Sequence, residues 1–313
     1  MSLLPELNHS VLDTEFPALH ADVYQSNDSD SGVPFLFEPG VCLISKPQTD
    51  LSAACEGFVE TFNPDLGFDD YRREPPILPE AEELCKFAGQ LCYLSFGPGR
   101  TKDDRADEYF RNILASGHGS VLEHAQFSFL FYGISRSLTH ELVRHRAGFA
   151  YSQVSQRYVD GSKLRFVCRP EFADDPSQLE SFKERIEEAA RSYEEIAAHY
   201  QKKQEQNLEA AAAMGVKLPY TKADLRKRVN QIARACLPNE TEAPIVASAN
   251  GRAWRHFLGM RGSLAAETEI RRLAVKVYQI LAGRRVAPLL VQDIQVDKDL
   301  AGDEYLIVGH LKV

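Results

Sequence analysis

An alternating run of aromatic residues is the feature that most restricts how this 313-residue chain can fold. Residues 125–132 read AQFSFLFY, and Phe127, Phe129 and Phe131 fall on one side of an extended strand, because successive side chains point to opposite faces. The pattern predicts a strand with one apolar face that the rest of the chain must cover. The preceding GHGSVLEH, residues 117–124, predicts a turn.

Helical patterns surround this strand in the sequence. Helices are predicted over residues 78–94, 103–116, 135–146, 177–214, 221–236 and 251–260, and from Ser263 onwards. Pro79 suits a first helical turn, and Gly215 followed by Pro219 ends the long charged helix. Short strands are predicted over residues 158–167 and 245–249.

Residues 1–77 have a different character, rich in Pro, Asp and Ser with short apolar patches. This composition predicts an irregular arm with a strand or two, not a separate folded domain. The remainder, residues 78–313, carries the periodic patterns. With 44% hydrophobic residues, the chain can bury a substantial core.

Charge and cysteine usage exclude several classes of function. The net charge of −9 argues against general binding of a nucleic acid polymer. The six cysteines are scattered and show no Cys-x-x-Cys or Cys/His spacing, so neither a disulfide framework nor a metal site is predicted. The first residues lack a basic and apolar leader, and no apolar run approaches about 18 residues. We therefore expect a cytoplasmic protein without a membrane partner.

The segment from residue 144 to 157, RHRAGFAYSQVSQR, concentrates three arginines in an acidic protein. On the helix predicted before it, Ser135 is a plausible N-cap, and Arg136, His140 and Arg144 lie four residues apart on one face. Aligned cations repel unless an anion lies opposite them. Because an arginine fork matches phosphate oxygens in pairs, the segment favours a phosphate-bearing ligand.

A solvated basic helix end is the alternative interpretation of these arginines, and for any single one it is the more common case. The cluster favours a lined pocket, because aromatic and apolar residues are interleaved with the charges.

RHRAGFAYSQVSQRY resembles the signature of the flavin-dependent thymidylate synthases, the ThyX family. Four further segments match the family in the same order: GHGSVLEH at 117, SRSLTHELVRHR at 135, RACLPNET at 234 and NGRAWRHFLGMR at 250. Together the five motifs cover the chain from about residue 80 to 285.

The resemblance implies an α+β (mixed α/β) fold in which an antiparallel sheet packs with long helices, and a ThyX-like catalytic domain over residues 78–313. It implies a homotetramer with active sites at subunit junctions. It also implies bound FAD, with NADPH as reductant and methylenetetrahydrofolate as one-carbon donor. The implied reaction methylates C5 of dUMP.

The resemblance also implies site residues, by position in the motifs. FAD contacts would come from Ser120, Arg144, His145, Arg146, Gln153, Asn250, Arg252 and His256. The nucleotide would be held by Glu141, Arg144, Gln153, Ser155, Gln156, Arg157, Arg234 and Arg261, with Arg136 near its phosphate. Arg261 is the expected catalytic residue, because a guanidinium at the pyrimidine edge can stabilise the charge that develops there. Ser155 is expected to contact substrate, not to act as a nucleophile.

Two departures from the family bear on the substrate. Eight residues separate Arg146 from Ser155 where the family has seven, and Ala265 stands where many members have a histidine near the flavin. One alternative is therefore a ThyX-like paralogue that methylates UMP in a nucleoside-antibiotic pathway. An alternative of another class is a non-enzymatic nucleotide- or RNA-binding protein.

Overall fold

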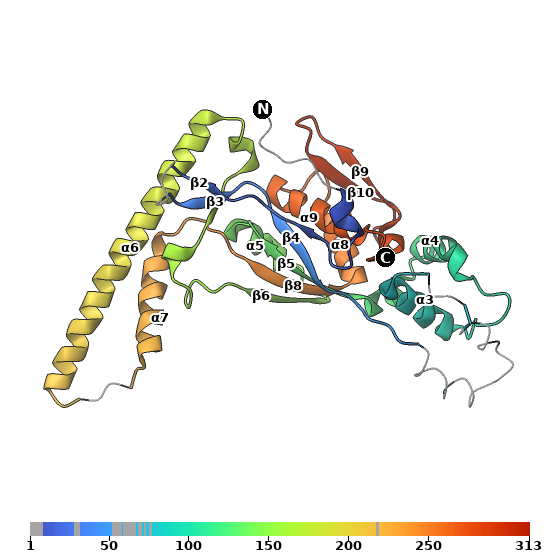
Figure 1. Cartoon of the computed structure of the whole chain (residues 1–313), viewed down its shortest axis with the longest axis horizontal. Helices are drawn as coiled ribbons and strands as arrows, with labels where there is room; N and C mark the ends of the chain where they lie inside the picture. Colours follow the sequence, from blue (N-terminus) through green and yellow to red (C-terminus); the bar gives the residue numbers. More distant parts are fainter. Residues whose placement is uncertain are drawn as a thin grey trace.

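A computed structural model describes residues 9–27, 32–51, 77–216 and 219–313, together with residues 58, 67, 71, 73 and 74. Most of the segment between residues 52 and 76 lies outside the described residues, and so do residues 28–31 and 217–218. Figure 1 shows a central sheet with a long helical hairpin at one end and a helix pair at the other.

The central sheet is antiparallel throughout, with the strand order β1-β4-β5-β8-β6. Its strands are β1 (Ala18–Leu19), β4 (Gly40–Ser45), β5 (Gln126–Tyr132), β6 (Phe149–Gln153) and β8 (Ile245–Asn250). The alternation predicted for β5 is confirmed, because Phe127, Phe129 and Phe131 are each at most 1% exposed. The mixed α+β class with an antiparallel sheet is therefore confirmed.

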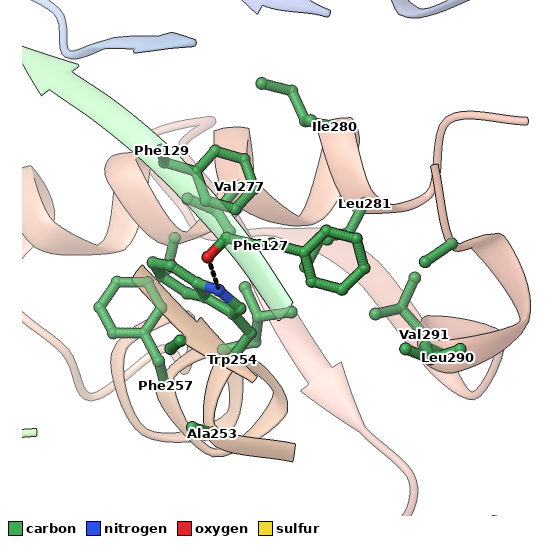
Figure 2. Packing of buried hydrophobic residues seen from close by; sticks show 14 of the residues in the cluster. Phe127, Phe129, Ala253, Trp254, Phe257, Val277, Ile280, Leu281, Leu290 and Val291 are labelled. Carbon is green, nitrogen blue, oxygen red and sulfur yellow. Dashed lines mark hydrogen bonds between the residues drawn. The ribbon is translucent and has the colours of Figure 1, made fainter. Parts of the chain in front are cut away.

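Helices α8 (Gly251–Arg261) and α9 (Thr268–Leu281) supply the apolar cover that this face requires. Trp254 is fully buried, and its ring meets that of Phe129 edge-on with 5.0 Å between centroids. Its indole N–H donates to the carbonyl oxygen of Phe127 at 3.3 Å, as Figure 2 shows. The one tryptophan of the sequence thus ties α8 to the central strand.

The predicted helix over residues 135–146 is shorter in the structure. Helix α5 (Arg136–Leu142) is capped by Ser135, whose hydroxyl accepts from Leu138 N. A tight turn replaces the last residues of the predicted helix. There His145 N donates to Leu142 O at 3.1 Å, which ends the helix and sends the chain into β6. The arginine-rich segment therefore divides between a turn and an edge strand.

The elements at the two ends of the sheet largely follow the predicted helices. One end carries α3 (Glu80–Cys92) and α4 (Ala106–Ser116). The other carries α6 (Pro176–Ala213) and α7 (Lys222–Ala233), beside a small sheet of β2 (Tyr24–Gln25), β3 (Pro34–Leu36) and β7 (Phe166–Val167). A hairpin of β9 (Ile294–Lys298) and β10 (Glu304–Val308) follows α9. The 3-10 helices are η1 (His9–Asp13), η3 (Asp103–Arg105), η4 (Gly119–His124), η5 (Gly161–Lys163), η6 (Pro170–Phe172), η7 (Arg234–Cys236) and η8 (Pro288–Val291).

Three further predictions of secondary structure need correction. Residues 18–45 hold four short strands, not one or two, and β1 and β4 join the central sheet. The strand predicted over 158–167 is reduced to β7, because the short helix η5, which Asp160 caps, interrupts the predicted range. The last long helix begins at Thr268, not Ser263, because the side chain of Glu267 accepts from the first backbone N–H groups of α9.

The division into an arm and a catalytic domain at residue 77 stays a prediction. In the described ranges, none of the helices combines the length and the apolar composition that a bilayer crossing requires.

Candidate active site

The turn between α5 and β6 folds back against the start of α8. Gly148 has a φ of +77°, and a Cβ there would lie 3.0 Å from Ala253 Cβ and 3.1 Å from Asn250 Nδ2. Asn250 is the N-cap of α8, since its Oδ1 accepts from Ala253 N at 2.8 Å. Glycine is suited to both the positive φ and the close approach. The turn with the additional residue therefore lies against one of the other predicted site segments.

Tyr151 fastens this turn to the sheet. Its hydroxyl lies 2.9 Å from the carbonyl oxygen of Leu142 and 2.8 Å from that of His145, and it donates to this pair. Burial raises the pKa of Tyr151, so the hydroxyl remains a donor. The sequence places aromatic residues among the charges of this segment, but its pattern did not predict the hydrogen bonds of the Tyr151 hydroxyl.

Arg261, at the end of α8, is held by two residues from the segment around α5. Its Nε donates to His145 Nε2 at 3.0 Å, and its Nη1 donates to Glu141 Oε2 at 2.7 Å. A longer contact of 3.4 Å joins Nη2 to the carbonyl oxygen of Glu141. Burial, with the nearby charges of Arg261 and His256, lowers the pKa of His145 to about 4. His145 is therefore an uncharged acceptor at neutral pH.

Five arginines of the predicted site have no acidic partner among the described residues. They are Arg136, Arg144, Arg146, Arg157 and Arg234. Among the described residues, two donors of this segment, Nε of Arg157 and Nε2 of Gln156, are buried without a hydrogen-bond acceptor. Both atoms therefore keep a donor that an acceptor on a bound ligand would satisfy.

The predicted site residues fall on five parts of the fold. Arg136, Glu141, Arg144, His145 and Arg146 lie on α5 and the turn after it, and Gln153, Ser155, Gln156 and Arg157 lie on β6 and just beyond. Asn250, Arg252, His256 and Arg261 lie at the end of β8 and on α8, while Ser120 lies on η4 and Arg234 on η7.

Direct contact joins only some of these residues. Glu141, His145 and Arg261 form a hydrogen-bonded group, and the His256 ring lies 5.7 Å from that of His145. Arg252 instead pairs with Glu123 at 2.7 Å. Across the described ranges, no hydrogen bond, ion pair or ring contact links Ser120 or Arg234 to the other predicted residues.

Ser155 lacks the surroundings of a nucleophile. Its hydroxyl accepts from Arg157 N at 3.3 Å, and within the described part of the chain no histidine or carboxylate is hydrogen-bonded to it. A serine without an adjacent base has the weak nucleophilicity of an ordinary alcohol. A binding role fits this geometry better.

The chain resembles known proteins both in sequence and in structure. A family model described as thymidylate synthase complementing protein matches residues 77–289. The flavin-dependent thymidylate synthase of Mycobacterium tuberculosis strain H37Rv is 42% identical over 236 residues, which span 74% of this chain and 88% of that protein. The enzyme of the same description from Mycolicibacterium vanbaalenii is 42% identical over 229 residues, spanning 71% and 85%.

A similar fold occurs in the UMP/dUMP methylase PolB of Streptomyces cacaoi, whose crystal structure contains 5-Br dUMP. The TM-score is 0.50 with 18% sequence identity, and the match covers 81% of this chain and 93% of that one.

Proposed function

Because the chain belongs to the family of flavin-dependent thymidylate synthases, we propose that it methylates C5 of dUMP and that Arg261 is its central catalytic residue. The one-carbon donor would be methylenetetrahydrofolate, and NADPH would be the reductant.

The observation that carries this proposal is the set of arginines without acidic partners. Uncompensated cations repel one another and are kept where a ligand supplies the negative charge. Arg136, Arg144 and Arg157 suit a nucleotide phosphate, because a guanidinium binds two phosphate oxygens at once. Gln156 adds a buried amide donor that has no acceptor in the described part of the chain.

Arginines of the same group also fit the pyrophosphate of FAD, the flavin that we propose. Arg146 and Arg144 are exposed on the turn, beside the N-terminus of α8, which favours negative charge. Ser120, Gln153, Asn250, Arg252 and His256 would complete the cofactor contacts. When bound, the flavin supplies the hydride for reduction, which no side chain can provide.

Arg261 would act on the pyrimidine. A guanidinium has five N–H groups, and three are engaged by His145 and Glu141, which leaves two. C5 of uracil is a weak nucleophile, and charge grows on the pyrimidine oxygen and nitrogen atoms as C5 attacks. Two free donors on a permanently charged group would stabilise that charge, and the bonds to Glu141 and His145 would together keep the group in place.

Shared sites would explain why the predicted residues do not all converge within one chain. We propose a homotetramer in which Ser120 or Arg234 reaches the site of another subunit. The protein would act in a reducing cytoplasm, where scattered thiols stay free.

Turnover with dUMP or UMP, methylenetetrahydrofolate and NADPH tests the proposal, with products separated by chromatography. dTMP formation supports it, and exclusive methylation of UMP would replace it with the paralogue function. Purified protein without flavin absorbance and without turnover would favour a nucleotide-binding protein. Light scattering after size exclusion tests the tetramer, and an active flavin-bound monomer would exclude shared sites.

A further inference from the structure

Building on the proposed function, we propose that His145 is a positioning residue, whose unprotonated Nε2 accepts the Nε–H of Arg261 and holds the guanidinium against the pyrimidine edge. This assignment differs from a flavin contact through the imidazole, which the family resemblance implies. In this proposal the imidazole ring positions the residue that contacts the substrate.

The His145 ring is fixed from several directions. The residue is only 9% exposed, and ring centroids of Phe257 and Phe149 lie 5.4 Å and 6.0 Å from its own. Its backbone is held as well, because Tyr151 donates to its carbonyl oxygen at 2.8 Å. A ring enclosed in this way presents Nε2 to Arg261 in one orientation, so the acceptor is already in place before substrate arrives.

The charges around His145 maintain the acceptor state. Arg261 and His256 face it from α8, β6 contributes the uncharged Tyr151, and Glu141 of its own segment bonds to Arg261. A protonated imidazole would point an N–H at the N–H of Arg261, and burial opposes its charge. The low pKa of His145, about 4, agrees with this geometry.

Glu141 alone would leave Arg261 free to turn. The bonds to Nη1 and Nη2 both come from Glu141 on α5, whereas the bond to Nε comes from His145 in the turn that follows. Arginine has many rotamers, so losing the Nε anchor would let the two remaining N–H groups point away from the substrate.

The test compares His145→Phe, which keeps a ring without an acceptor, with His145→Gln, which keeps an acceptor. His199→Phe, at an exposed position on α6, is the control for the substitution itself. Three quantities are measured for each purified protein: bound flavin, turnover per bound flavin, and dissociation constants for dUMP and for deoxyribose 5-phosphate. Deoxyribose 5-phosphate lacks the base that Arg261 would contact.

We expect His145→Phe to weaken dUMP binding and to lower turnover per flavin, each roughly 10- to 100-fold, the usual effect of losing a hydrogen bond to a charged group. Flavin content and affinity for deoxyribose 5-phosphate should stay at the wild-type level, and His145→Gln should recover part of the loss. Flavin lost with normal turnover per remaining flavin would assign the ring to the cofactor and overturn the inference. Wild-type affinity for dUMP in His145→Phe would overturn it as well.

A spectroscopic measurement tests this inference separately from the proposed function. It also keeps the inference testable if His145→Phe does not fold. Burial is the largest cause of the low pKa of His145 and the Arg261 cation is the second, so in protein labelled with ¹⁵N-histidine, Arg261→Gln should raise this pKa in part. An unchanged pKa would refute the contact. A wild-type protein that binds dUMP but transfers no carbon would refute the reaction and leave the contact standing.

Discussion

Two groups of arginines in this protein lie in contrasting surroundings, one buried beside carboxylates and the other exposed to solvent. Near the C-terminus, Arg255 and Arg271 are almost fully buried, with side chains 2% and 6% exposed, and each bonds to an aspartate. Arg255 forms two bonds to Asp293, at 2.7 Å and 3.0 Å. At the predicted site, Arg144 and Arg146 are exposed and have no acidic partner in the part of the chain that the structure describes.

The difference is the one expected between cations that stabilise the fold and the binding cations that we propose. A buried charge must be paired, since desolvation without a partner costs several kcal/mol. The paired group therefore contributes to the folded state and has no charge left for a ligand. The unpaired group contributes little to folding and keeps its donors for an anion. Arg261 is intermediate, since it is anchored by His145 and Glu141 but has two N–H groups left.

Breaking the buried pair should give the largest effect. Asp293→Ala leaves the Arg255 cation buried with only the carbonyl oxygens of Leu290 and His310 as acceptors. We expect the free energy of unfolding, measured with urea, to fall by about 3–5 kcal/mol. The control is Asp13→Ala, whose partner Arg284 is 78% exposed, and about 0–1 kcal/mol is expected there. Equal losses in the two variants would contradict the distinction.

Arg261→Ala should lower turnover per bound flavin by about 100- to 1000-fold, the usual effect of removing one preorganised donor. Arg261→Lys should recover little, because an ammonium cannot present two aligned donors. Flavin content, read from absorbance, should remain at the wild-type level. Loss of flavin with normal turnover per remaining flavin would place Arg261 with the cofactor.

Ser155→Ala should retain measurable turnover and weaken dUMP binding by about 1–3 kcal/mol, the range for one lost hydrogen bond. Titration calorimetry gives the affinity, and Ser152→Ala, at an exposed position on β6, is a matched control. Abolished turnover, with a serine–nucleotide adduct trapped in the wild type, would show that Ser155 is a nucleophile.

His145 at the predicted site and Asp293 in the buried pair should also respond differently to acid. Because the pKa of His145 is lowered from 6.5 to about 4, the unfolded chain binds a proton in this window that the folded protein does not. His145 therefore costs no stability above pH 6.5 and increasingly destabilises the fold as pH falls towards 4. Burial would raise the pKa of Asp293, but bonds from Arg255 outweigh burial and lower it, so this pair persists through that window and is lost only below it. Urea midpoints between pH 7 and pH 4 should fall less steeply in His145→Gln than in wild type, and identical slopes would contradict the assignment.

Removing a site arginine should have the smallest effect on stability. Arg144→Gln is expected to change the free energy of unfolding by no more than about 0.5 kcal/mol in the absence of ligand, as for other surface substitutions. Its affinity for dUMP should nevertheless fall. A large destabilisation without ligand would mean that this arginine also has a structural task.

Patterns in neighbouring residues predicted most helices and strands, but they did not predict the contacts between residues far apart in the sequence. The alternation in β5 and the periodicity of α6 are encoded in adjacent residues, so strand and helix could be predicted. The true end of α5 depends on Tyr151, which holds the turn from the neighbouring strand. The bond between His145 and Arg261 joins residues 116 positions apart, which no local pattern records. The resemblance named both residues but not their contact.

The length of α6 has a consequence for the amide hydrogens of the protein. The helix has 38 residues, about 57 Å, yet between Tyr193 and Ala211 it buries no side chain. Amides in this outer part should exchange with solvent faster than those around Phe182 and Ile186, because opening there exposes little apolar surface. α7 is anchored at its far end, where Ala233 is fully buried just before the segment that carries Arg234. The outer part of α6 can therefore open locally while that arginine stays in place.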